Sequence, residues 1–397
     1  MIKRFNNFGE VGKIYDSLFL FCLLFPAGFG FFSILLALSP SNIVKTNTIS
    51  AGASVIFALT ANRIGRMISA AIATIPKWQH KEGILSGVMQ ILGFVFLFLA
   101  LQNNYPLLFF VTSAACFGFA LTSGNVFFRT LLTTGASHIN HKNYSILFYS
   151  FWGIGIAFAG LIWEHPLRIF FIAIIMSISA ISCWIAIKIT PPKIKSENKE
   201  QQIFFWRKKT RELAHSGLIS TPAVISACVA ILFNAALVPL LTVNLGFTTA
   251  QTGIAACFIV FGNILASLDG KVKLANLNPF YGILISLAGN ILLVLLLFLL
   301  RDAWIMALFV IVGIGIFSSW NLKFQMAFVQ NLARTDSHRL IHAMSEILAV
   351  IGGLGLGVLS SHGMHTNIQF LLIGAVLVLW WGIMVSKFTP EELAKIS

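Results

Sequence analysis

The sequence is dominated by apolar runs of about 20 residues, which recur along its whole length between polar segments. A helix rises about 1.5 Å per residue, so each run is long enough to cross a hydrocarbon core of about 30 Å. Only 10% of the residues are charged, against roughly 25% in soluble domains. A soluble chain needs a polar surface that this composition does not supply. We therefore expect the chain to be embedded in a lipid bilayer.

Twelve such runs predict twelve membrane spans. The longest polar stretch, 190–217, divides them into six and six, so we expect an N-terminal six-helix bundle (1–189), a basic linker (190–217) and a C-terminal six-helix bundle (218–397). The fold class is therefore all-α integral membrane. The predicted spans are 17–38, 48–75, 83–101, 105–127, 144–163, 168–189, 218–243, 249–268, 279–300, 303–322, 339–361 and 367–386.

Lysine and arginine are concentrated in alternate connections. With the N-terminus inside, the outer loops hold only Lys45, Arg168 and Arg301, and the basic linker lies inside. The positive-inside rule then predicts a multi-pass protein of the plasma membrane, the inner membrane in a bacterium, with both termini cytoplasmic. The net charge of +14 follows this loop pattern. It is not gathered on one face with stacking aromatic residues, so we expect no nucleic-acid partner.

Two glycine-rich stretches repeat at an offset of 196–197 residues. The first runs from Asn125 to Gly160 and the second from Asn321 to Gly357, which relates the fourth and fifth spans to the tenth and eleventh. Repeats of this kind are typical of transporters, whose substrate site lies at the interface between the two halves. We therefore expect the two bundles to be pseudo-symmetric.

Three features resemble the major facilitator superfamily over essentially the whole chain. They are the two sets of six spans around a basic loop, the Leu-Gly and Gln-x-Gly pattern within 239–253, and the glycine-rich fifth and eleventh spans. The pattern is most similar to bacterial efflux-type members. The loop motif at Asn62–Met67 is degenerate, however, and Gly153–Gly160 lacks the proline of the drug antiporters. The resemblance implies a monomeric secondary transporter that works by alternating access, is not an enzyme and needs no cofactor.

Charged side chains inside spans are costly and point to function. Arg63 and Arg66 lie three residues apart on one face of the second span, where they would attract an anionic group; the alternative places both in the cytoplasmic interface. Glu346 is the only acidic residue well inside a span. A carboxyl group held away from water can carry the coupled proton. The alternative for Glu346 is a local pair with His342.

The resemblance places the second and eleventh spans face to face across the two halves. Counted from the predicted cytoplasmic ends, Arg66 and Glu346 lie at similar depths. We therefore predict a gating salt bridge between them that forms when the protein is closed to the cytoplasm and breaks when it opens inward. Arg63 lies one turn deeper and is predicted to contact substrate. Other substrate-binding candidates, each with helix packing as its alternative, are Phe29, Trp152 and Asn234, with the further amides Gln90, Asn263 and Asn290.

No metal site is expected. The cysteines lie inside apolar runs without a CxxC pattern, and His362 and His365 lie in a predicted outer loop. There is also no GxxxxGK[ST] motif for ATP. The sequence thus favours a proton-coupled carrier of a small organic solute that is amphipathic and, as the arginines favour, anionic. Export by antiport is preferred; import of a siderophore or another chelate is the alternative, and an integral-membrane transferase is a distant one.

Overall fold

The computed structural model describes residues 28, 51–73, 78, 81–102, 106–133, 141–188, 210–268, 277–300, 303–332 and 337–387. Within them the chain forms long helices and no strand. The helices are α3 (Ala51–Ala73), α4 (Glu82–Gln102), α5 (Pro106–Thr133), α6 (His141–Ile162), α7 (Arg168–Lys188), α9 (Thr210–Pro239), the π-helical turn η2 (Leu240–Asn244), α10 (Thr249–Leu268), α11 (Pro279–Leu299), α12 (Trp304–Leu332), α13 (Ser337–Ser361) and α14 (Thr366–Lys387).

Each predicted span from the second to the twelfth corresponds to one of these helices. The first predicted span, 17–38, lies outside the described residues. Among those described, nine helices are long and apolar enough to cross a membrane. Three ends differ from the prediction by six residues or more: α5 continues to Thr133 rather than ending near 127, α9 begins at Thr210, within the predicted linker, and α12 continues to Leu332 rather than ending near 322. The extension of α9 (210–216) and that of α12 (322–332) contain no glycine or proline. Because these are the residues that most often end a helix, each helix can continue beyond the end of its apolar run.

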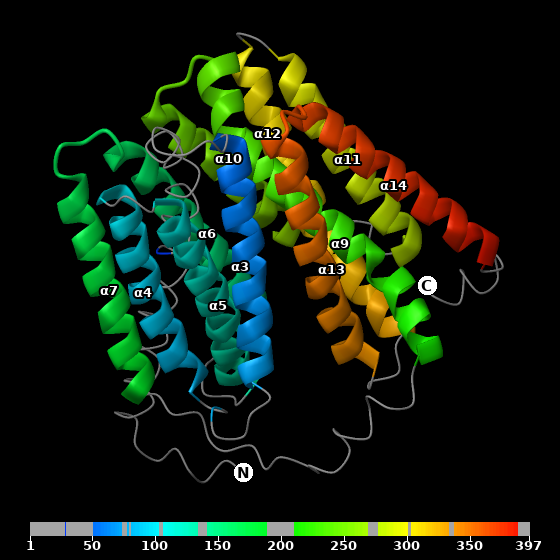
Figure 1. The fold of residues 1–397 in the computed structure, drawn as a ribbon, viewed down its shortest axis with the longest axis horizontal. Coiled ribbons are helices and arrows are strands. Elements are labelled where there is room, and N and C mark those ends of the chain that lie inside the picture. Colours follow the sequence, from blue (N-terminus) through cyan, green and yellow to red (C-terminus); the bar gives the residue numbers. More distant parts are fainter. Residues whose placement is uncertain are drawn as a thin grey trace.

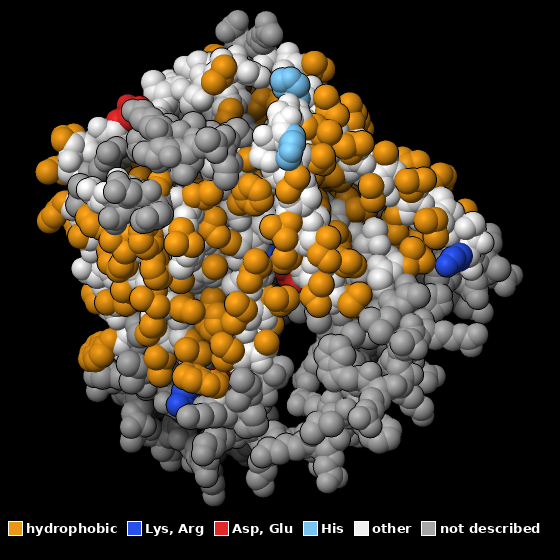
Figure 2. Space-filling model, viewed as in Figure 1, with side chains coloured by type: hydrophobic (Ala, Val, Ile, Leu, Met, Phe, Trp, Pro, Cys, Tyr) orange, Lys and Arg blue, Asp and Glu red, His pale blue; other side chains and the backbone are white. Residues whose placement is uncertain are grey.

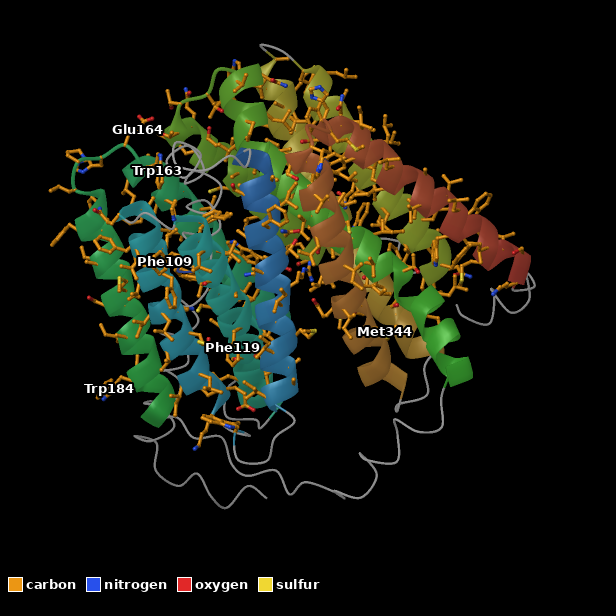
Figure 3. The ribbon with its side chains drawn as sticks, viewed as in Figure 1. Phe109, Phe119, Trp163, Glu164, Trp184 and Met344 are labelled. Carbon is orange, nitrogen blue, oxygen red and sulfur yellow. The ribbon has the colours of Figure 1, made fainter. Side chains whose placement is uncertain are left out.

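The surface of the described part is that of a protein in lipid. Figure 2 shows apolar side chains over most of one face, with charged groups mainly near its margins. Trp184 is 56% exposed near the end of α7, and Trp163 lies at the opposite end of the same bundle (Figure 3). Tryptophan is enriched at both interfaces of a membrane protein. These features identify the chain as a multi-pass membrane protein.

The helices form two bundles (Figure 1). In the first, α5 packs on α3 and α4, and α4 packs on α7. In the second, α12 packs on α10 and α11, while α9 packs on α13 and α14. Between the bundles, α3 contacts α13 and α9, and α6 contacts α10. The described helices are therefore arranged in two bundles, as the sequence predicts, and the first predicted span lies outside the described residues.

Close glycine contacts reveal the pseudo-symmetry of the bundles. Gly65 and Gly118 allow α3 and α5 to touch, because a Cβ on either would overlap a backbone carbonyl of the other helix. Gly262 and Gly315 do the same for α10 and α12. Each glycine of the second pair follows its counterpart by 197 residues. The overlapped carbonyls, those of Ala115 and Asn62 in the first bundle and of Val312 and Ile259 in the second, keep the same offset.

The two crossings between the bundles are related by the same repeat. At the α6–α10 crossing, Gly160 and Gly253 lie backbone against backbone, and a Cβ on Gly160 would be 2.6 Å from Gly253 Cα. At the α3–α13 crossing, Gly353 lies against Thr60 and Gly357 against Phe57. Figure 1 shows α3 and α13 separating toward the ends at Ala73 and Ser337. The bundles therefore meet along α3 and α13 at one end of the molecule and part at the other.

Proline inside α9 creates a bond between helices. Pro222 has no N–H, so the carbonyl of Leu218, four residues earlier, loses its partner within the helix. Trp380 of α14 supplies one, because its Nε1 donates to Leu218 O at 3.0 Å. At the second proline, Pro239, α9 gives way to η2. Both prolines therefore shape the helix that borders the cavity described below.

Candidate functional site

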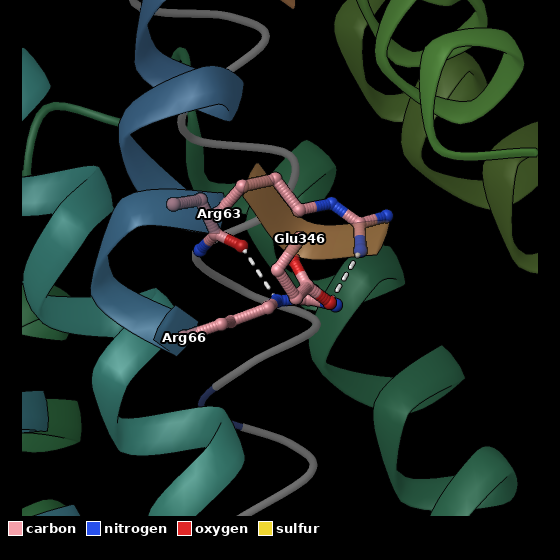
Figure 4. Close-up of polar contacts among 4 residues, drawn as sticks. Arg63, Arg66 and Glu346 are labelled. Atoms are coloured by element: carbon pink, nitrogen blue, oxygen red, sulfur yellow. Dashed lines mark hydrogen bonds and ion pairs between the residues drawn. The ribbon is translucent and has the colours of Figure 1, made fainter. Parts of the chain in front are cut away.

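An ion pair joins the two bundles at the α3–α13 crossing. Arg63 Nη1 lies 3.4 Å from Glu346 Oε1, and the two side chains are 20% and 13% exposed (Figure 4). Each charge alone would cost on the order of 3 kcal/mol at the centre of a membrane helix. A partner of opposite sign relieves part of that cost, and breaking such a pair restores it. The contact therefore favours the arrangement in which α3 and α13 touch.

The ion pair lies one helical turn from the predicted bridge between Arg66 and Glu346, which was predicted for the state closed to the cytoplasm and stays a prediction. Arg66 does not take Glu346 as its hydrogen-bond partner; its Nε donates to Asn62 Oδ1 on the same helix at 3.0 Å (Figure 4). The predicted bridge paired residues at similar distances from the predicted helix ends, 75 and 339. Each of these ends differs by two residues from the end in the structure. With α3 ending at Ala73 and α13 beginning at Ser337, Arg63 and Glu346 both lie roughly 15 Å from those ends, and Arg66 lies nearer to its own.

Glu346 contributes one negative charge beside the positive charges of two arginines. Arg66 lies within electrostatic range of both Arg63 and Glu346, so two positive groups share one carboxylate. Glu346 Oε2 is buried and has no hydrogen-bond partner among the described residues. The carboxylate is thus the only described group that offsets the repulsion between two arginines on one helix face. Neutralising it would leave that repulsion uncompensated.

A cavity of about 230 Å³ lies largely in the second bundle and is bordered by the first. Residues of α9, α10, α11 and α12 line it, and Trp152 and Ile156 of α6 border it from the other side. Among the described residues, its lining contains no charged side chain. Its polar side chains, besides Trp152, are Ser226, Asn234, Asn263, Asn290 and Ser318.

The structure brings together some of the predicted substrate-binding residues and separates others. Trp152 and Asn234, far apart in the sequence, both line the cavity. Arg63 and Arg66 are not among its lining residues. Phe29 lies outside the described residues. The predicted candidates therefore form two separate features, a cavity without a charged residue in its described lining and an ion pair at the crossing.

Several polar residues of the site were not predicted. Ser226 and Ser318 line the cavity, and Asn62 holds Arg66. Asn321, which is 1% exposed, donates to Ser226 Oγ at 2.9 Å and accepts from Gln325 at 3.0 Å. Serine is common in membrane helices, where it packs closely and often bonds its own helix, so its presence in an apolar run does not single it out.

No protein-family model matches the chain, and no curated protein matches it. Solved structures do. A crystal structure of the nucleoside transporter NupG superposes with a TM-score of 0.72 over 95% of this chain and 100% of that one, at 15% identity. The chain has the major facilitator fold. A D-xylose–proton symporter, with a TM-score of 0.69 over 96% of this chain and 99% of the other at 12% identity, has the same fold.

The fold agrees with the geometry. The major facilitator fold has two related halves. This chain likewise has two related bundles that cross each other, a cavity bordered by both and an ion pair on one crossing. At these levels of identity the likeness shows the fold alone. The substrate and the driving force have to be argued from the residues themselves.

Proposed function

We propose that the chain is a secondary transporter that moves a small uncharged organic solute by alternating access. The observation that carries the proposal is the cavity, whose polar lining in the second bundle faces Trp152 of the first. A site bordered by both bundles can change its exposure when the bundles rock against each other. The similar folds named above belong to a nucleoside transporter and a sugar–proton symporter, which fits a carrier of small solutes.

The lining of the cavity favours an uncharged solute over the anionic one that the arginines first indicated. It supplies amides, hydroxyls, an indole and apolar groups. Arg63 is engaged by Glu346 and Arg66 by Asn62. A desolvated anion in this cavity would have no cation among the lining residues to offset its desolvation.

We propose a gating role for the α3–α13 crossing, which the ion pair between Arg63 and Glu346 supports. The contacts run from Gly52 beside Ser360 to Arg63 beside Glu346, toward the Ala51 end of α3. With the predicted cytoplasmic N-terminus, that end faces outward. The pair would therefore hold the outer side closed and break when the protein opens outward. The bridge predicted between Arg66 and Glu346 was instead expected to break when the protein opens inward.

Glu346 is the group we assign to proton coupling. Protonation removes the negative charge that holds Arg63 and balances Arg66, so it favours separation of α3 from α13. Protonation together with bound solute would give symport, and protonation in place of solute would give the export by antiport that the sequence favours. The two modes differ in the sign of accumulation under an imposed pH gradient.

The proposal is tested by counterflow in proteoliposomes without any ion gradient. Vesicles are preloaded with one unlabelled solute and mixed with its labelled form, across a panel of sugars, nucleosides and organic acids. A carrier gives saturable, transient accumulation of label with one of them. Flux that does not saturate would indicate a channel, and chemical conversion of the probe by the purified protein would indicate an enzyme; either result contradicts the proposal.

A further inference from the structure

Resting on the proposed transport function, we infer that the cavity recognises a small polyhydroxylated ring that bridges the two bundles. The solute accepts a hydrogen bond from Trp152 of α6 and donates hydrogen bonds to the amide oxygens of Asn290 and Asn234, on α11 and α9. The inference rests on the polar atoms that these side chains leave open at the cavity.

Asn290 supplies a buried acceptor. The side chain is only 3% exposed, its Nδ2 donates to Ser318 Oγ at 3.3 Å, and its Oδ1 has no partner. Exchanging the amide oxygen and nitrogen would again leave one atom without a partner; that atom would then be a donor, which a hydroxyl group of the solute satisfies equally well. A buried unpaired amide atom costs about 1–3 kcal/mol. A ligand group in the adjoining cavity can recover that cost.

Asn234 supplies a second acceptor, and its amide orientation is fixed. Its Nδ2 donates to Ala230 O at 2.7 Å, and a backbone carbonyl can only accept. The nitrogen is therefore committed to its own helix, and Oδ1 is the atom of the amide left for the cavity that Asn234 lines. The second bundle thus presents the amide oxygen of Asn234 and, in the orientation in which Asn290 Nδ2 donates to Ser318, that of Asn290. Both oxygens call for O–H or N–H donors on the solute.

Trp152 supplies the donor from the first bundle. Its Nε1 is buried and has no partner. The ring is held by Tyr149, stacked at 6.3 Å between centroids, and by Phe148, edge-on at 5.6 Å. An indole nitrogen only donates. Because Trp152 lines the cavity, an acceptor on a bound solute can satisfy this N–H.

The volume of the cavity and the absence of charged side chains from its described lining limit which solutes can bind. The cavity, at about 230 Å³, is smaller than the roughly 300–1,000 Å³ of sites for drug-sized ligands. The solute must offer at least two donors and one acceptor in that space without carrying a charge. Hydroxyl groups both donate and accept, so several of them on one small ring meet this requirement. A monosaccharide and the ribose of a nucleoside share this chemistry.

The test compares neutral and charged molecules of one skeleton in counterflow with the reconstituted full-length protein. The probes are D-glucose and uridine as neutral solutes, and D-glucuronate and D-glucosamine, assayed at about pH 6 where both are ionised, as charged analogues that keep the ring of the sugar. We expect exchange of at least one neutral probe and none of the charged ones. Exchange of charged probes alone overturns this inference and leaves the transport function standing, whereas absence of exchange with every probe of the wider panel overturns both.

Two variants test the named contacts. Trp152→Phe removes the N–H and keeps an aromatic ring, and Asn290→Leu removes the amide. Each should raise the half-saturating concentration of the neutral probe about three- to tenfold, the effect of one neutral hydrogen bond. Trp304→Phe, at a position 55% exposed at the start of α12, is the matched control and should leave it unchanged. Equal half-saturating concentrations for Trp152→Phe and the control would show that the indole N–H does not bind the solute.

Discussion

The Glu346→Gln substitution should open the α3–α13 crossing. Coulomb's law with an effective dielectric of 20 gives about 5 kcal/mol for unit charges at the 3.4 Å between Arg63 Nη1 and Glu346 Oε1. Both side chains are partly exposed, so solvent screening reduces this value. We expect the substitution to shift the equilibrium toward separation of α3 and α13 by about 2–3 kcal/mol, which is roughly 30- to 150-fold.

Substituting Glu346 and substituting Arg63 should not open the crossing to the same extent. Removing Glu346 leaves Arg63 and Arg66 repelling each other on one helix face, whereas removing Arg63 leaves Arg66 within electrostatic range of Glu346. Glu346→Gln should therefore open the crossing more than Arg63→Met does. The double variant should differ little from Glu346→Gln alone, because the pair is already broken.

A disulfide across the crossing provides the assay. A Cβ on Gly52 would lie 3.6 Å from Ser360 Oγ, so cysteines at 52 and 360 meet the distance requirement for a disulfide when the crossing is closed. In a background without the native cysteines, cross-linking should be fast with Arg63 and Glu346 intact and slowed by Glu346→Gln. Glu164→Gln, at an exposed position beyond α6, is the control. Equal cross-linking rates in all variants, or additive effects of the two substitutions, would refute the reasoning.

Three further predictions concern other contacts. Gly160→Ala should lower the melting temperature and impair exchange, because its Cβ would lie 2.6 Å from Gly253 Cα; thermal unfolding of Gly382→Ala, where nothing lies within 4 Å, should match that of the unmodified chain. Arg66→Met should slow cross-linking at 52 and 360 less than Arg63→Met, since Arg66 bonds its own helix; the opposite order would restore the predicted bridge to Arg66. Cysteine labelling should place Lys195 and both termini inside and 362–367 outside, and external labelling at Lys195 would reverse the orientation.

The fold could be predicted because bilayer thickness dictates the length of an apolar run. The repeat could also be predicted, since glycines that permit close contact recur at a fixed offset, as Gly160 and Gly357 do. Helix ends were less predictable. The apolar run marks the membrane boundary, while α12 continues beyond it to Leu332.

The candidate site could be predicted only in part. The cost of burying charge singled out Arg63, Arg66 and Glu346, but the choice between the arginines depended on helix ends two residues away from the predicted ones. The cavity was harder to foresee because its lining comes from five helices. Asn234 and Trp152 were recognisable as polar or aromatic residues in apolar runs, yet only the packing of α6 against α10 brings them to one space.

The most direct test of the account separates exchange from accumulation. Proteoliposomes that hold the Glu346→Gln variant are assayed twice with the probe that the unmodified chain exchanges, once in counterflow and once under an imposed pH gradient. The account predicts that counterflow persists, since the cavity residues are unchanged, while accumulation against the solute gradient is lost. Accumulation by the variant equal to that of the unmodified chain would contradict the role of Glu346 and with it the link between the ion pair and transport.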